Sequence, residues 1–194
     1  MSSTNTSTTN SRILKLFKSR NTLIEQLEEL QYDVSEHMDF SINEIDAMNN
    51  NTQLDFTLKH NKNERKIHVK YYLTSKQINR ANLDNIIEDE PNETTINKIK
   101  YLYNRDGIFV VIHNINRLQY NLLNHTLVPK CTILGNSEID ELKKKYNIMD
   151  TKQLPEISRF DPQALAKCMR PGQICKFERE SSTALFYDYY RICV

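Results

Sequence analysis

The stretch RPGQICKFERESSTALFYDYYRICV, from Arg170 to Val194, decides the fold of the last part of this chain. Pro171 followed by Gly172 predicts a type II turn, because proline presets one central position of that turn and glycine tolerates the positive φ of the other. Two runs of strand-forming residues follow, separated by a turn near residues 180–183, and they predict a β-hairpin. Chain ends are usually polar and frayed unless something ties them down. The apolar end therefore indicates that a folded unit holds this hairpin.

Alternation along the second strand divides its side chains between two faces. One face carries Phe186, Tyr190 and Ile192, and the other carries Tyr187, Tyr189 and Arg191. Two interpretations stay open from the residues alone. The aromatic side chains cover a small core, or one face remains free for a partner, where tyrosine and arginine are favoured contact residues.

Two short helices and a few strands precede this hairpin. Ser137 and Asp140 have the spacing of a capping box at the start of one helix. Asp161 followed by Pro162 predicts the start of another, which we expect to run to about Met169. A unit of this size is a small α+β domain with little core of its own, so it gains stability by burying its hairpin against a partner.

The first part of the chain mixes helical and strand periods and predicts an α/β layer domain. Apolar residues from Arg12 to Leu30 recur at helical spacing. Ser41 opens a second helix with a capping box, in which Ile42, Ile45 and Met48 are expected to face inward.

Two alternating stretches around residues 54–58 and 67–71 predict a β-hairpin with a long polar loop. Residues 83–87 are expected to form a short strand, and a turn at residues 91–95 to cap a helix ending near Tyr103. The apolar run of residues 108–112 (IFVVI) is typical of a strand covered on both faces.

Composition excludes several classes of protein. The net charge of +1 argues against unaided binding of nucleic acid, which needs many unbalanced basic residues. The four cysteines form no C-x-x-C pair, and the sequence contains neither a glycine-rich phosphate loop nor a Ser/His/Asp set. We therefore expect no metal and no cofactor. Without a long apolar run or an apolar leader, we expect an intracellular protein with no membrane contact.

One alternative is a metal-dependent nuclease that uses Asp55, Glu64 and Lys66, whose order resembles the acidic and lysine residues of such enzymes. The simpler explanation is that Glu64 belongs to the solvated loop HNKNERK at a hairpin tip, and we favour that explanation. His125 is likewise expected to be hydrogen-bonded in a structural turn rather than to act as a ligand or base.

Several motifs in the second part of the chain occur in one order. They are H-x-L-V-P at residues 125–129, L-P-x-I at 154–157, D-P-x-A at 161–164, R-P-G-Q-I at 170–174, R-x-S-x-T-A at 179–184 and Y-R-I-x-V at 190–194. Any one of them is a weak signal, but together in sequence they are specific. The unit that contains them resembles the fifth subunit of eukaryotic nuclear RNA polymerases and its archaeal counterpart. It differs in having Cys131 where a histidine is common, and Leu185 where a glycine is common.

The first part of the chain resembles the jaw domain that the eukaryotic and viral forms of this family add. Residues 1–10 are polar and of low complexity, so we expect a disordered tail there. The resemblance implies an α/β jaw with a nuclease-like layer fold over residues 11–116 and a small α+β assembly domain over residues 117–194. The added jaw and the abundance of Asn, Ile and Lys together indicate a large DNA virus as the source. We expect the host cytoplasm or the virion as its location, or the nucleus if the form is cellular.

The function that the resemblance implies is that of a non-catalytic subunit of multisubunit DNA-directed RNA polymerase. Such a chain docks on the largest subunit, meets other core subunits, and holds its jaw beside downstream duplex DNA. The residues implied in docking are His125, Pro129, Pro155, Asp161, Pro162, Arg170, Pro171, Gly172, Arg179, Thr183, Tyr190 and Arg191. Those implied near DNA are Pro91, Asn92, Thr94 and Thr95.

Overall fold

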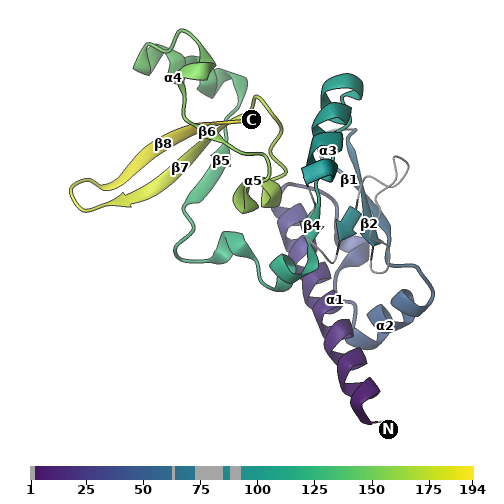
Figure 1. Ribbon diagram of the computed structural model, residues 1–194. Helices are drawn as coiled ribbons and strands as arrows, with labels where there is room; N and C mark the ends of the chain where they lie inside the picture. Colours follow the sequence, from purple (N-terminus) through teal and green to yellow (C-terminus); the bar gives the residue numbers. More distant parts are fainter. Residues whose placement is uncertain (1–2, 63, 73–84, 88–92) are drawn as a thin grey trace. The chain divides into compact units, whose positions relative to one another are not determined.

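The computed structural model describes residues 3–62, 64–72, 85–87 and 93–194. The chain forms two compact units, Met1–Asn121 and Leu122–Val194 (Figure 1). The boundary expected from the sequence, at residues 116–117, lies inside a short 3₁₀ helix whose Ile115 and Leu118 are buried in the first unit. The physical boundary falls a few residues later, because those two side chains anchor the segment to the core that precedes it.

The first unit contains helices and short strands in alternation. Its elements are α1 (Ser3–Glu29), η1 (Ser35–His37), α2 (Ile42–Asn50), β1 (Phe56–Lys59), β2 (Lys66–Tyr72), β3 (Asn85–Ile87), α3 (Glu93–Asp106), β4 (His113–Asn114) and η2 (Ile115–Gln119). The sheet order is β1-β2-β3-β4, with β1 and β2 antiparallel and the remaining pairs parallel. This is a mixed α/β arrangement, and the nuclease-like layer fold stays a prediction for it.

Helix α1 is longer than the sequence pattern indicates. It begins at Ser3, whereas the sequence predicts a disordered tail over residues 1–10 and a helix from about Arg12. The difference follows from helix cooperativity, since each residue added to an existing helix gains one backbone hydrogen bond without a new nucleus. The predicted apolar face is confirmed from Ile13 to Leu27, and it packs against the buried side chains of α2 and β1.

The second helix keeps its predicted start but not all of its predicted core. The Ser41 hydroxyl accepts from the Glu44 backbone N–H, and the Ser41 N–H donates to the Glu44 carboxylate, which completes the capping box. Ile45 is fully buried and Met48 packs on the core, whereas Ile42 is exposed. Ile42 is the first residue of α2, where the helix has not yet entered the core.

The apolar run of residues 108–112 is not a strand, although its composition predicts one. The hydrogen-bonded strand is β4, which lies directly after this run and pairs with β3 through Ile86 and Ile87. Val110 and Ile112 are buried and Ile108 is exposed. Apolar composition therefore indicates burial here, but a strand also requires a neighbour whose backbone can complete the ladder.

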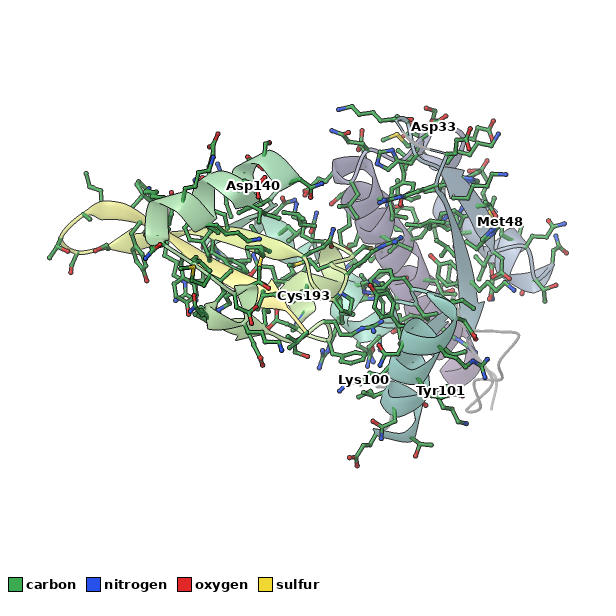
Figure 2. The ribbon with its side chains drawn as sticks, turned by 90° about the horizontal axis from the view of Figure 1, so that it is seen from above. Asp33, Met48, Lys100, Tyr101, Asp140 and Cys193 are labelled. Atoms are coloured by element: carbon green, nitrogen blue, oxygen red, sulfur yellow. The ribbon has the colours of Figure 1, made fainter. Side chains whose placement is uncertain are left out.

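The second unit is a small α+β domain built on a four-stranded sheet. Its elements are η3 (Leu122–Asn124), β5 (Lys130–Ile133), α4 (Asn136–Tyr146), η4 (Thr151–Gln153), β6 (Glu156–Ile157), α5 (Pro162–Ala166), β7 (Ile174–Ser181) and β8 (Leu185–Cys193). The sheet order is β5-β7-β8-β6, so the C-terminal strand β8 is interior at its base. Cys193 is buried among these strands (Figure 2).

Both helices of this unit differ slightly from their predicted limits. Helix α4 begins two residues earlier than predicted, with Gly135 at its N-cap, so Ser137 and Asp140 do not form the predicted capping box. The Glu138 carboxylate accepts from the Gly135 N–H at 2.7 Å, which is half of a box, because glycine has no side chain to supply the other half. Helix α5 starts at the predicted Asp161 cap but ends at Ala166, because Cys168 takes a left-handed conformation.

Candidate docking site

The base of the β7–β8 hairpin is held by the turn that the sequence predicts. Gly172 has a φ of +86°, and the Gln173 N–H donates to the Arg170 carbonyl at 3.1 Å, as a type II turn requires. The Gly172 N–H then donates to the Cys193 carbonyl at 2.8 Å, and the Cys193 N–H donates to the Gln173 carbonyl at 2.8 Å. Arg170, Pro171 and Gly172 thus act inside the fold, where they fix the end of β8.

The other side of β8 is held by the segment around Pro155. The Ile192 N–H donates to the Pro155 carbonyl at 2.9 Å, and the Val194 N–H donates to the Ile157 carbonyl at 2.9 Å. The Arg159 N–H donates in turn to the Val194 carbonyl at 2.8 Å. These bonds pair the end of β8 on the side opposite to β7.

The first motif of the unit also has a structural role. The Leu127 N–H donates to Nδ1 of His125 at 3.2 Å, which confirms the predicted turn. The Pro129 carbonyl accepts from the side-chain amide of Gln163 at 2.6 Å, and the Asp161 carboxylate accepts from the Gln163 backbone N–H at 2.9 Å. Pro162 occupies the first turn of α5. These residues join β5 to α5 and build the platform from which the hairpin extends.

The core of this unit is rich in thiols. Its buried members are Ile157, Ala164, Met169, Cys175, Phe177 and Cys193, with Cys131, Ile133 and Tyr189 packed against them. Burial raises the pKa of Cys168 and that of Cys193 to about 11. The pKa of Cys131 is lowered because the Cys175 thiol donates a hydrogen bond to it. Within the described ranges no group of His, Cys, Asp and Glu side chains is arranged to hold a metal ion.

The outer part of the hairpin extends beyond its neighbours, and we call residues 179–191 the distal ribbon (Figure 1). Strand β5 pairs with β7 only up to Glu178, and β6 pairs with β8 only at Ile192 and Cys193. Leu185, Phe186 and Tyr187 near the tip are 79%, 65% and 42% exposed. Tyr190 and Arg191, closer to the base, are partly buried. Exposure therefore depends on distance from the base, whereas the sequence pattern indicates one covered and one free face.

The turn at the tip lies slightly later than predicted, at residues 182–184. The Ser181 hydroxyl accepts from the Thr183 N–H at 3.3 Å, and the two hydroxyl oxygens are 3.2 Å apart, so Thr183 shapes the turn. Leu185, at the position where the resemblance implies a glycine, has a φ of +59°. A left-handed conformation costs such a side chain about 1 to 2 kcal/mol, so the turn is strained at an exposed apolar residue.

The first unit does not bring the nuclease candidates together. The Asp55 carboxylate accepts from the Tyr71 N–H at 2.9 Å, at one end of β2, while Lys66 starts the opposite end. Five residues of strand separate these ends by about 16 Å. Glu64 lies in the exposed loop before β2. This geometry does not favour the nuclease hypothesis, because a metal site needs these groups within a few ångströms of one ion.

The residues expected near DNA are only partly within the described chain. Pro91 and Asn92 lie outside the described residues. Thr94 is exposed and Thr95 half-buried in the first turn of α3. A helix with the length and apolar character needed to span a bilayer does not occur in the described part of the chain.

Fold and geometry together define a class of protein, one with a small sheet domain whose hairpin exposes apolar side chains at its tip. The family model for the C-terminal domain of RNA polymerase Rpb5 matches residues 120–193, which cover nearly the whole second unit. The chain belongs to this Rpb5 family, as the motifs in its sequence indicate. It is a non-catalytic component of DNA-directed RNA polymerase.

Archaeal and eukaryotic relatives match over nearly the same length of this chain. DNA-directed RNA polymerase subunit Rpo5 of Thermococcus kodakarensis is 42% identical over 76 residues, which are 39% of this chain and 92% of the relative. Subunit Rpo5 of Pyrococcus abyssi is 41% identical over the same shares. Subunit RPABC1 of RNA polymerases I, II and III of Caenorhabditis elegans is 39% identical over 77 residues, 40% of this chain and 36% of the relative.

Proposed function

We propose that this chain enters DNA-directed RNA polymerase by docking the distal ribbon of its second unit on the largest subunit. The observation that carries the proposal is the run of exposed apolar side chains at the ribbon tip, Leu185, Phe186 and Tyr187. The rest of the family motifs hold this ribbon in place. The hydrogen bonds at its base hold the hairpin in one orientation, so a partner can bind it without first ordering it.

The energetics favour a covered ribbon. Full burial of a large apolar side chain contributes about 1.5 to 3 kcal/mol relative to exposure. The tip also has unpaired strand edges, which natural proteins usually cover or blunt with charge. Docking would remove both the exposed aromatic surface and the free edges from water.

For the first unit, the proposed role is that of a jaw beside downstream duplex DNA within the assembled enzyme. The support is its family context and the first turn of α3, where the exposed Thr94 and the helix backbone offer donors to phosphate beside the carboxylate of Glu93. Such contacts position DNA without reading its sequence. The nuclease-like layer fold, the viral source and the location in host cytoplasm, virion or nucleus belong to the same proposal and rest on resemblance and residue usage.

The test is assembly of the enzyme with a truncated ribbon tip. The double substitution Phe186→Ala and Tyr187→Ala is co-expressed with the polymerase core subunits of the same source, and co-purification of the largest subunit is measured. We expect the affinity to fall by more than about tenfold, since truncating an interface aromatic typically costs about 2 kcal/mol or more.

The matched control is Met149→Ala, which removes a side chain that is 84% exposed but lies outside the ribbon in the same unit. This variant should assemble like the wild type. If the double variant co-purified with the largest subunit as well as this control does, the ribbon would not be the docking element.

A further inference from the structure

The two faces of the β7–β8 hairpin carry opposite charge. One face, which we call the basic aromatic face, presents Arg179, Tyr187, Tyr189 and Arg191, and nearer the base it continues through Phe177 and Cys175 into the core of the unit. The other, the acidic face, presents Lys176, Glu178, Glu180 and Asp188 together with Phe186 and Tyr190. The antiparallel register produces this division, because directly opposed residues such as Arg179 and Tyr187 share a face.

The acidic face balances part of its own charge. Lys176 lies 3.0 Å from a carboxylate oxygen of Asp188 and 3.9 Å from one of Glu178. Glu180 lies further toward the tip and is exposed. The charge of Lys176 is therefore already neutralised by carboxylates on its own face.

The basic aromatic face lacks such compensation. The Arg179 guanidinium lies 4.5 Å from the ring centroid of Tyr189, and that of Arg191 lies 5.3 Å from the same centroid. Among the described residues neither guanidinium has a carboxylate within ion-pair distance. Arg191 donates through Nη1 to the Glu156 carbonyl at 3.3 Å, while its buried Nε has no acceptor.

We propose that the basic aromatic face docks an acidic segment of the largest polymerase subunit, whose carboxylates pair with Arg179 and Arg191 while its apolar groups pack on the exposed Tyr187. This inference rests on the proposed function and names the face and the partner's chemistry. A guanidinium already stacked on a ring is fixed in place, so it loses little further freedom when its planar donor fork meets a carboxylate. The basic aromatic face attracts an acidic partner and the acidic face repels it, so the charges determine which face the partner binds.

A nucleic acid fits the same face less well. Two guanidinium groups neutralise about two phosphates, which gives only weak and moderately salt-dependent binding. Glu178, Glu180 and Asp188 lie on the opposite face of the same two strands and repel phosphate. The two positive charges on one face and the carboxylates on the other therefore favour an acidic protein segment over a nucleic acid.

The experiment compares neighbouring charge reversals on opposite faces. Arg179→Glu reverses the basic aromatic face, and Glu180→Lys makes the opposite charge change at the next residue of the same strand. Each variant is assembled with the polymerase core subunits, and association with the largest subunit is measured over a series of salt concentrations. Unfolding curves of each variant establish that it is folded, and Arg179→Ala is used if the reversal prevents folding.

We expect Arg179→Glu to weaken association more than about tenfold at low salt, and the difference from wild type to shrink as salt rises. Glu180→Lys should leave association unchanged or strengthen it. Equal losses in both variants, or no loss with Arg179→Glu, would overturn the proposal.

If Arg179→Glu has no effect while the Phe186 and Tyr187 double variant fails to assemble, the face assignment is wrong and the docking function stands. Binding of a short single-stranded oligonucleotide that Arg179→Glu abolishes would assign the face to nucleic acid instead.

Discussion

At the scale of single residues, Arg20 shows how far tertiary contacts can depart from a helical pattern. Arginine side chains are mostly exposed in folded proteins, yet Arg20 is only 2% exposed. Its Nη1 donates to the Leu54 carbonyl at 3.0 Å, and its guanidinium lies 4.4 Å from the Phe56 ring and 5.4 Å from the Phe40 ring. Burial lowers the pKa of Arg20, and the aromatic rings supply cation–π contacts in place of water.

His113 gives a prediction at the same scale. Burial lowers the pKa of His113 to about 4, from an ordinary value near 6.5. Because the folded pKa lies below the unfolded one, the unfolded chain binds more protons between these pH values, and stability falls as pH falls through this window. We expect the free energy of unfolding to decline from pH 6.5 to pH 4 less steeply in His113→Gln than in the wild type. Denaturant unfolding at several pH values measures this, and identical pH slopes would contradict it.

At the scale of elements, the hairpin base depends on one turn conformation. Gly172 holds a left-handed conformation and donates its N–H to the strand end at Cys193. Sequence predicts this turn because proline and glycine impose it locally. Residues 108–112 are the opposite case. Whether they form a strand depends on a backbone partner far away in the chain, which their own composition does not specify.

Substitution of Gly172 tests this dependence. Gly172→Ala should lower the free energy of unfolding by about 1 to 2 kcal/mol, through the cost of a left-handed alanine. No atom lies within 4 Å of the position of an added Cβ, so the cost comes from the backbone alone. Gly172→Asn should lose less, because asparagine tolerates positive φ better although it is larger. Denaturant unfolding of the full chain compares the three proteins, and an equal or greater loss in Gly172→Asn would indicate crowding instead.

At the scale of the whole molecule, the two units have different relations to known proteins. The family match covers residues 120–193, and the archaeal relatives are matched over 92% of their own length. The second unit alone therefore corresponds to an almost complete protein in archaea. The first unit, with its mixed sheet and long α1, is an addition to that module, and its jaw role remains a prediction.

The charge of the whole molecule predicts how it behaves alone. With a net charge of +1, the isolated protein should bind duplex DNA weakly, because few unbalanced cations are available to release counterions. Duplex binding measured over a range of salt concentrations checks this. A tight interaction with a steep salt dependence would contradict it, since it would show that the chain holds DNA without the rest of the polymerase.

The sequence by itself determined the features that depend on neighbouring residues: the turn at Gly172, the caps at Ser41 and Asp161, and the ordered motifs that identify the family. Those signals are local, since a turn or a cap needs only a few adjacent residues. Tertiary structure alone decided that Arg20 is buried, that residues 108–112 form no strand, and that the hairpin is exposed along its distal ribbon rather than along one face. Burial and strand pairing depend on partners far away in the chain, and no local pattern specifies which surface those partners leave open.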